Sequence, residues 1–595
     1  MKIIRKALAV LMAAVLLSSV LMGCTTLKKL EDGTYDRGAV INLYLSDPVY
    51  NFDPQVPVTD DAMLKVFSLI YEGLTTLKSN GKWQKAMMDS YTVKANDLDG
   101  YSIFVTLKQT KWTDGREVQA VDFVYSWKRL LEPDFKGEAA CLLYDIKNAR
   151  EINTGDKSID DLGVSAVDTY TLKITFESSD IDLDRFFTNL SAIALVPVRE
   201  DIIARYGDDW AQRPTSIVTN GPFTVKQMIE DNEEVIRLER NGYYFRDIEK
   251  DYLDKYVIPY RLVTNYDVGD LEAQLAAYDG ESIFYVGELP LSVRADYKKK
   301  AEVEDTLITQ SFIFNTKKDP FTKAEVRRAL SLALDREKIA EMLVFAVPAT
   351  GLVPAKAFDT TRKTSFRKEA GDILSTSANV SEAKNLLSSA GVSSGSFSIT
   401  VRDNEADIAV AEYAAEVWKE LGFNVTVDVA KVGRTDPISE DEGSFVYNVD
   451  TFENKYTESN FDVILTDVSM PSPDPFSVLA PYAGDFSGYG TDLYPEVPGN
   501  YEIFTHPSGY TSDSYMDLIE KAFAEKNLKN RAPILHDAEK LLMEDMPVCP
   551  LVYLQSAYIK SKILKGFDTD YYGVTNFKRV KMKNYMKYKQ EDTEE

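Results

Sequence analysis

Residues 111–131, KWTDGREVQAVDFVYSWKRLL, predict how the first half of the chain folds. In the preceding residues 101–107, hydrophobic and polar side chains alternate, which predicts a strand. Asp114-Gly115 predicts a turn, because glycine takes a positive φ without steric cost. Pro133 then ends the helix that follows the turn. The hydrophobic residues of this helix recur at the spacing of one amphipathic face: Phe123, Trp127, Leu130 and Leu131.

Length and charge limit the classes of function. A chain of 595 residues is too long for a single hydrophobic core and is expected to form two or three domains. Hydrophobic residues at 44% and charged residues at 27% are typical of globular proteins. The net charge of −26 argues against nucleic acid as a partner, because phosphate binding requires clustered Lys and Arg.

The N-terminus has the pattern of a bacterial lipoprotein signal. A basic start precedes the apolar residues 7–21, and the sequence LMGC at residues 21–24 resembles a lipobox. We therefore predict that residues 1–23 are a signal peptide, that Cys24 carries the lipid, and that residues 24–38 are a polar tether. A plain secretory signal with a chance cysteine is the alternative.

The remaining cysteines and the histidines do not predict a metal site. Cys141 and Cys549 lie among hydrophobic residues at no metal-ligand spacing, so we expect buried, unpaired side chains. His506 and His536 have no histidine at i+4, which argues against zinc and against a histidine-based hydrolytic triad. We expect no metal and no cofactor.

Several sequence strings resemble one protein family. Residues 112–129, W-x-D-G-x-x-V-x-A-x-D-F-V-Y-S-W-K-R, closely resemble the signature of the oligopeptide- and dipeptide-binding lipoproteins of bacterial ABC importers, extracellular solute-binding protein family 5. Further strings resemble the same family: residues 52–54, 72–74, 161–176, 219–223, 238–241, 314–337 and 546–558. One departure is Gln119, where the family usually has a threonine cap, so we predict a looser start of the helix.

The resemblance implies an α/β, two-lobed, periplasmic-binding-protein-like fold of the large three-domain class II type, with a hinge and a ligand cleft between the lobes. It implies a division of the chain into domain I in lobe 1, domain II, and domain III as lobe 2. Domain I comprises residues 39–80, 195–310 and 556–595; domain II comprises residues 81–194; domain III comprises residues 311–555. Alternating strands and helices in residues 381–429 predict a mostly parallel sheet in domain III.

Local patterns predict further details. Asn220-Gly221 is expected to form a tight turn that leads into antiparallel strands. Thr322 is expected to cap a helix, with Glu325 completing a capping box, and Asp335 is expected to cap the next helix. Residues 434–460 and 484–512 are polar or rich in Tyr, Gly and Pro, which predicts surface insertions.

The resemblance also implies ligand-binding positions. In the relatives, two extended segments pair with the backbone of the bound peptide, and the matching residues here are Val58, Thr59, Asp60, Asp467, Val468 and Ser469. The carboxylate that holds the free amino group of the peptide in the family falls on Pro471, and a cleft tyrosine falls on Ala139. Asp467 is a candidate for a displaced carboxylate, because a buried ammonium group needs a partner, and a structural aspartate in a turn is the alternative.

These observations favour a non-enzymatic receptor. We expect a monomer, anchored by its lipid to the outer face of the cell membrane, that captures a peptide and delivers it to an ABC permease and ATPase complex. The alternatives are a receptor of the same fold for a nickel chelate or a sugar oligomer, and a sensor of peptide signals. An extracellular hydrolase with paired carboxylates is a more remote alternative.

Overall fold

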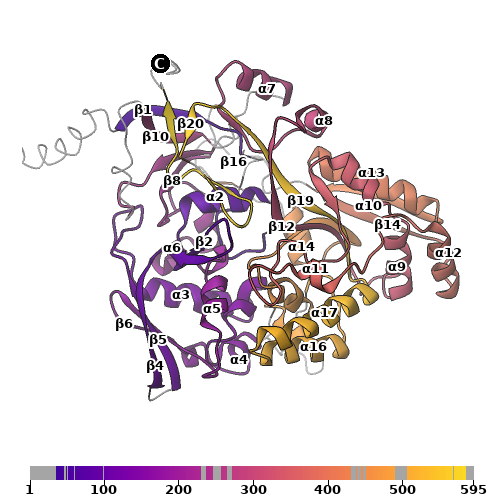
Figure 1. Ribbon diagram of the computed structural model, residues 1–595, viewed down its shortest axis with the longest axis horizontal. Helices are drawn as coiled ribbons and strands as arrows, with labels where there is room; N and C mark the ends of the chain where they lie inside the picture. Colours follow the sequence, from indigo (N-terminus) through magenta and orange to yellow (C-terminus); the bar gives the residue numbers. More distant parts are fainter. Residues whose placement is uncertain are drawn as a thin grey trace, which may run out of the picture.

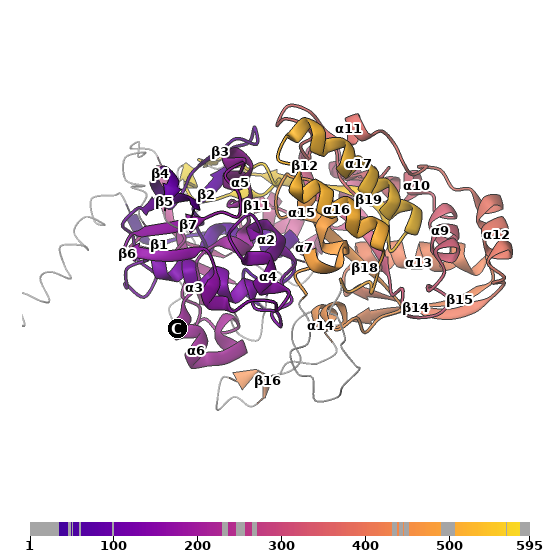
Figure 2. The same cartoon turned by 90° about the horizontal axis from the view of Figure 1, so that it is seen from below.

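The computed structural model describes residues 35–45, 49, 51–58, 61–97, 100–228, 236–244, 256–263, 271–430, 437–438, 444–445, 451–489, 506–566 and 568–583. The predicted signal peptide, Cys24, Thr59 and Asp60 lie outside these residues. Figures 1 and 2 show two lobes: the first holds the N-terminal half of the chain together with the yellow C-terminal strand β20, and the second holds most of the later part. In the described part of the chain, no helix is long and apolar enough to span a bilayer.

The first lobe contains a six-stranded sheet assembled from distant parts of the chain. Its order is β20-β23-β10-β9-β8, and β1 pairs in parallel with β10. The helix α2 (Asp61–Ile70) lies against this sheet, and Phe67, Phe223 and Phe577 share its core. The strands are β1 (Tyr35–Asn42), β8 (Phe223–Gln227), β9 (Arg237–Arg240), β10 (Tyr256–Val263), β20 (Leu564–Lys565) and β23 (Lys581–Lys583).

A second, four-stranded sheet has the order β4-β5-β7-β6 and carries the helix α3 (Ala120–Leu131). The predicted strand is confirmed as β5, and the predicted hydrophobic face of α3 is fully buried. The strands are β4 (Met88–Asp97), β5 (Gly100–Leu107), β6 (Val164–Asp168) and β7 (Thr171–Thr175).

The prediction of a loose start of α3 is wrong. The carboxylate of Asp122 accepts a hydrogen bond from the backbone N–H of Gln119 at 2.8 Å and another from the indole N–H of Trp112 at 3.1 Å. Asp122 therefore fixes the first turn, and an aspartate near a helix N-terminus is also favoured by the helix dipole.

The second lobe is built on a seven-stranded sheet of order β11-β19-β12-β18-β14-β15, with β13 paired to β19. β14 pairs in parallel with β15 and β18, whereas β12 pairs antiparallel with β18 and β19. The sheet is therefore mixed: the prediction of parallel strands is confirmed for β14 and β15, on which it was based, and wrong for the pairs that β12 makes with β18 and β19. The strands are β11 (Tyr285–Val286), β12 (Glu302–Phe314), β13 (Ala346–Pro348), β14 (Gly395–Arg402), β15 (Phe423–Ala430), β18 (Val463–Ser469) and β19 (Val548–Lys560).

Helices surround this sheet (Figure 1). They include α9 (Ala324–Leu332), α10 (Arg336–Leu343), α12 (Val380–Ser389), α13 (Glu405–Lys419), α16 (Asp513–Ala524) and α17 (Leu528–Asp545). Asp335 caps α10, as predicted, by accepting from the N–H of Lys338. Thr322 does not cap α9, because the N-cap position is Lys323 and the Thr322 hydroxyl donates to Asp319 instead.

The long strands β12 and β19 run across the predicted domain boundaries at residues 311 and 555. Their outer ends pair with each other at Glu302 and Tyr558. β11, from the segment assigned to domain I, pairs with β19 and so joins the sheet of the second lobe. The division into three domains stays a prediction, but the lobes share continuous strands.

Asn220-Gly221 joins two distant segments and does not act as a hairpin turn. The Asn220 amide accepts from the N–H of Glu72 at 3.0 Å and donates to its carbonyl at 2.8 Å, while the Gly221 N–H donates to the carbonyl of Ile70 at 2.8 Å. A Cβ atom at Gly221 would lie 2.3 Å from the carbonyl carbon of Ile70. Glycine is therefore required by the close approach of two backbones.

We expect Gly221→Ala to destabilise the protein by about 1–3 kcal/mol, because the added methyl meets backbone atoms that cannot yield without displacing α2. Chemical denaturation of the full chain measures the change. Gly242→Ala is the matched control, since a Cβ there meets no atom within 4 Å, and its effect should stay below about 0.5 kcal/mol. Similar losses in both variants would contradict the close-approach explanation.

Candidate functional site between the lobes

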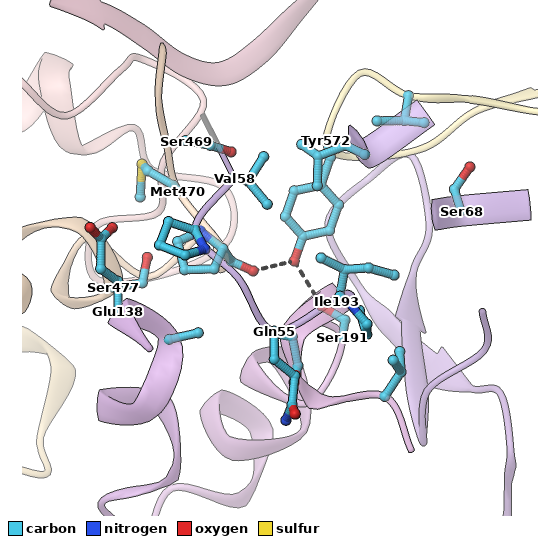
Figure 3. Close-up of a pocket in the computed structure, with 18 of the residues that line it drawn as sticks. Gln55, Val58, Ser68, Glu138, Ser191, Ile193, Ser469, Met470, Ser477 and Tyr572 are labelled. Carbon is cyan, nitrogen blue, oxygen red and sulfur yellow. Dashed lines mark hydrogen bonds between the residues drawn. The ribbon is translucent and has the colours of Figure 1, made fainter. Parts of the chain in front are cut away.

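A pocket of about 1440 Å³, open solvent at its mouth included, lies between the two lobes. Figure 3 shows side chains from both lobes converging on it. The first lobe contributes residues 54–58 and the region of Glu138 and Ser191, and the second contributes residues 466–471 with Tyr482 and His506. Its lining residues are spread over both lobes, so a solute held there contacts both.

The structure brings together the predicted site residues that it describes. Val58 lies on one wall, and Asp467, Val468 and Ser469 of β18 lie on the other. Figure 3 shows Val58 and Ser469 close to each other at this place. The two segments are about four hundred residues apart in the chain, so their meeting depends on the fold. Their role in ligand binding stays a prediction.

The later part of one edge of β18 lines the pocket and, in the described part of the chain, has no neighbouring strand. β14 pairs with β18 only at Val463 and Ile464, so among the described residues the later part of β18 has a strand, β12, on one edge only. The N–H of Met470 donates to the carbonyl of Leu307 in β12. Because hydrogen-bonded and non-bonded pairs alternate in an antiparallel ladder, the N–H and C=O of Ser469 point away from β12.

The carboxylate of Asp467 lies within a buried ionic cluster. Arg402 donates to Asp467 at 3.0 Å and to Asp407 at 2.7 Å, and Gln310 donates to Asp407 at 3.0 Å. The guanidinium compensates the charge of Asp467, which fixes this aspartate to β14 and the start of α13. The side chain of Asp467 therefore has a structural role, while its backbone lies at the edge of the pocket.

Pro471, which occupies the expected acidic position, takes part in a contact between the lobes. Its carbonyl accepts from the hydroxyl of Tyr572 at 3.0 Å, and that hydroxyl lies 2.9 Å from the hydroxyl of Ser191 (Figure 3). Burial raises the pKa of Tyr572 well above its usual value, so the phenol remains a neutral donor. The loop that carries Tyr572, between β21 (Asp568–Thr569) and β22 (Thr575–Asn576), therefore connects both walls of the pocket.

Buried charges lie where the lobes meet, and one ion pair, Asp145 with Lys526, joins the two lobes. Asp145 of the first lobe pairs with Arg185 at 2.6 Å and with Lys526 of the second lobe at 3.0 Å, and Asp474 pairs with Arg531 at 2.8 Å. Burial by itself raises the pKa of both aspartates, but the nearby cations outweigh it and hold each pKa below its usual value. Both carboxylates are therefore ionised and paired.

Sequence reasoning missed a group of polar and aromatic side chains at one end of the pocket. Glu138, Tyr456, Tyr482 and His506 line the pocket there, and Tyr489 contacts Glu138. The described ends of the predicted surface insertions supply buried Tyr456, Tyr489 and His506, so that prediction is wrong for these residues. The abundance of tyrosine in residues 484–512 was the available signal.

We expect Arg531→Met to destabilise the protein by about 3–5 kcal/mol, because it leaves the buried carboxylate of Asp474 without its closest cation. Denaturation of the full chain measures the loss. Lys128→Met is the control: it removes an exposed pair with Asp160 and should cost less than about 1 kcal/mol. A small loss for Arg531→Met would show that the buried pair contributes little.

Asp570, on the pocket wall, makes the stability of the protein depend on pH. Burial raises its pKa from 3.8 to about 6, although its carboxylate accepts from the N–H groups of Tyr572 and Val574. The folded state therefore favours the protonated acid, and this stability is present below about pH 4 and is lost as the pH rises through about 6.

Asp570→Asn keeps the acceptor oxygen and removes the titration. We expect the variant to gain stability relative to the natural protein as the pH rises from 4 to 7, by up to about 3 kcal/mol. Urea denaturation of both proteins at pH 4.5 and 7 measures the difference. The same difference at both pH values would contradict the raised pKa.

Comparison with known proteins agrees with the two-lobed fold described above. The family model "Bacterial extracellular solute-binding proteins, family 5 Middle" matches residues 83–490. The dipeptide-binding protein DppE of Bacillus subtilis is 26% identical over 92% of this chain and 94% of its own length. The periplasmic murein peptide-binding protein MppA of Escherichia coli is 28% identical over 85% of this chain and 86% of its own length.

A solved structure shows the same fold. Haemophilus influenzae OppA in complex with the peptide RPPGFSPFR matches with a TM-score of 0.74 at 21% identity, over 93% of this chain and 100% of that chain. This confirms the lobed, periplasmic-binding-protein-like fold. Because the family model covers more than half of the sequence, the chain belongs to the bacterial extracellular solute-binding proteins of family 5.

Proposed function

We propose that the protein is a lipid-anchored extracytoplasmic receptor that encloses a peptide between its lobes and delivers it to an ABC transporter. The observation that carries this proposal is the edge of β18 in the pocket, where the main chain of Ser469 points away from β12. An extended peptide adds to such an edge through backbone hydrogen bonds, which recognise any sequence.

The composition of the pocket supports a peptide ligand. Its lining combines hydrophobic and polar side chains from both lobes, which suits varied side chains with water around them. Val58 and the residues before it line the same pocket from the first lobe, so a ligand strand on β18 also meets protein of the other lobe. Relatives named for binding dipeptides and murein peptides support the same class of ligand.

Three of the four described acidic residues that line the pocket are held by the protein itself, which supports binding rather than hydrolysis. A pair of catalytic carboxylates needs both groups to face the substrate. Here Glu72 pairs with Lys578 at 2.6 Å, Asp467 pairs with Arg402, and Asp570 accepts from two backbone N–H groups. These three carboxylates are therefore held by the protein itself, which favours a receptor.

The N-terminal sequence supports the location. The LMGC string at residues 21–24 is the basis for proposing a lipid on Cys24 and a place on the outer face of the cell membrane. We propose that the receptor acts as a monomer, with closure of the lobes as the step that a permease recognises.

Mass spectrometry of the solute that co-purifies with the full chain tests the class of ligand. We expect intact short peptides that are released on denaturation and rebind to the emptied protein. Recovery of a nickel chelate, a sugar oligomer or a steroid in their place would assign another solute to the same pocket. Cleavage of added peptides without retention would indicate an enzyme.

The backbone contact is tested by Ser469→Pro, which removes the N–H that faces the pocket and leaves the ladder bonds of β12 in place. We expect the affinity for the recovered peptide to fall about tenfold, the value of one hydrogen bond. Ser469→Ala keeps the N–H and should bind almost as well as the natural protein. Isothermal titration measures both variants, and equal affinities would exclude this contact.

A further inference from the structure

Glu138 lines the pocket where the two lobes meet. It begins the short helix η2 (Glu138–Leu143) in the first lobe. Its Oε1 atom accepts hydrogen bonds from the hydroxyls of Tyr456 at 2.8 Å and Tyr489 at 3.2 Å, which both belong to the second lobe. Figure 3 shows Glu138 beside Ser477 and Met470 at this end of the pocket.

Aromatic rings form the wall next to this carboxylate. The ring of Tyr482 stacks on His506 with centroids 4.0 Å apart, and the edge of Tyr456 meets the same imidazole at 6.5 Å. Burial lowers the pKa of His506 to about 3, and its Nδ1 atom accepts from the N–H of Ser508 at 3.1 Å. The histidine is therefore neutral and supplies no positive charge to Glu138.

The charge of Glu138 has no cationic partner in the described part of the chain. No Lys, Arg or protonated His of those residues lies within 4.0 Å of its carboxylate, whereas Glu72 and Asp467 each have one. Burial raises the pKa of Glu138, and the two phenol donors only partly oppose that rise. An uncompensated carboxylate in a buried pocket is costly unless a ligand supplies the opposite charge.

Two further polar groups at the pocket point to a ligand. The hydroxyls of Tyr482 and Thr466 are buried and, among the described residues, have no hydrogen-bond partner. Buried hydroxyls normally find a partner, so a bound group is expected to satisfy them. Aromatic faces and a carboxylate together are also the surroundings that a cation prefers, because the ring faces carry negative charge.

We propose that Glu138, with Tyr456, Tyr482 and His506, forms a subsite that binds an ammonium group of the solute. The inference rests on the proposed function, because it identifies which group of a peptide the pocket holds by charge. The ammonium belongs either to the free N-terminus or to a lysine side chain. The alternative is that Glu138 serves only to join the lobes through its two tyrosines.

Binding of peptide libraries by the full chain separates these possibilities. Three tetrapeptide libraries are compared: one with free N-termini and no lysine, the same library N-acetylated, and an N-acetylated library containing lysine. Each is incubated with the natural protein, with Glu138→Gln and with Glu458→Gln. Glu458 is the matched control, because it is an exposed acid that joins the lobes through Lys136.

We expect the natural protein and Glu458→Gln to retain one ammonium-bearing library at least about 30-fold better than the library without an ammonium group. The loss of one partner of a buried charge pair lowers the affinity by at least about this factor. The retained library shows whether the N-terminus or lysine is bound. Glu138→Gln should lose this preference while keeping its affinity for the blocked library.

Equal loss of all libraries in Glu138→Gln, or an unchanged preference, would overturn the subsite. If the natural protein retains no library, the peptide function fails and the subsite fails with it. Thermal unfolding shows whether Glu138→Gln folds. If Glu138→Gln does not fold, Glu138→Asp is used in its place. Its shorter carboxylate should reduce the preference for the ammonium-bearing library, and an unreduced preference in Glu138→Asp counts against the subsite.

Discussion

Strand β12 is the element on which both lobes and the pocket depend. It pairs with β19 along one edge and with β18 along the other, so it holds the centre of the second sheet. Its outer end pairs with the part of β19 that leads back toward the first lobe. Because a strand cannot lose its neighbours without leaving backbone groups unsatisfied, this pairing fixes where β18 lies and which of its edges faces the pocket.

The charges between the lobes have separate roles. The pairs of Asp145 and Asp474 with their cations lie where the lobes meet and are complete without any solute. Asp467 is complete as well, through Arg402. Glu138 differs, because its contacts are phenol hydroxyls, which stabilise a carboxylate without neutralising it. Three aspartates are thus paired with cations of the protein, whereas Glu138 is held only by hydroxyls from the other lobe.

The sequence predicted the local elements well where hydrophobic spacing decides them. The strand β5 and the buried face of α3 follow from alternation and from helical spacing, and no distant residue is needed to explain them. Some local predictions were wrong because the residues make other contacts than expected, as when Thr322 donates to Asp319 instead of capping α9. Asp122, rather than residue 119, fixes the start of α3, and Gly221 permits the close approach of two backbones rather than a turn.

The site was less predictable for a different physical reason. The carboxylate of Glu138 and the hydroxyl of Tyr456 are more than three hundred residues apart, and their contact exists only when the lobes meet. Periodicity and capping rules describe neighbours along the chain, so they carry no information about such a pair. Resemblance to the family located the walls at Val58 and Ser469, but it pointed to Pro471 for the acid, where none exists.

Pro471 and Ala139 are the two pocket positions at which the sequence departs from the family pattern, and both line the same space. A proline at 471 removes a carboxylate from the β18 wall, and an alanine at 139 leaves a small side chain directly after Glu138. A solute with an ammonium group still needs an opposite charge once it is enclosed. In the proposed subsite, Glu138 on the first lobe would meet this electrostatic requirement in place of an acid at position 471.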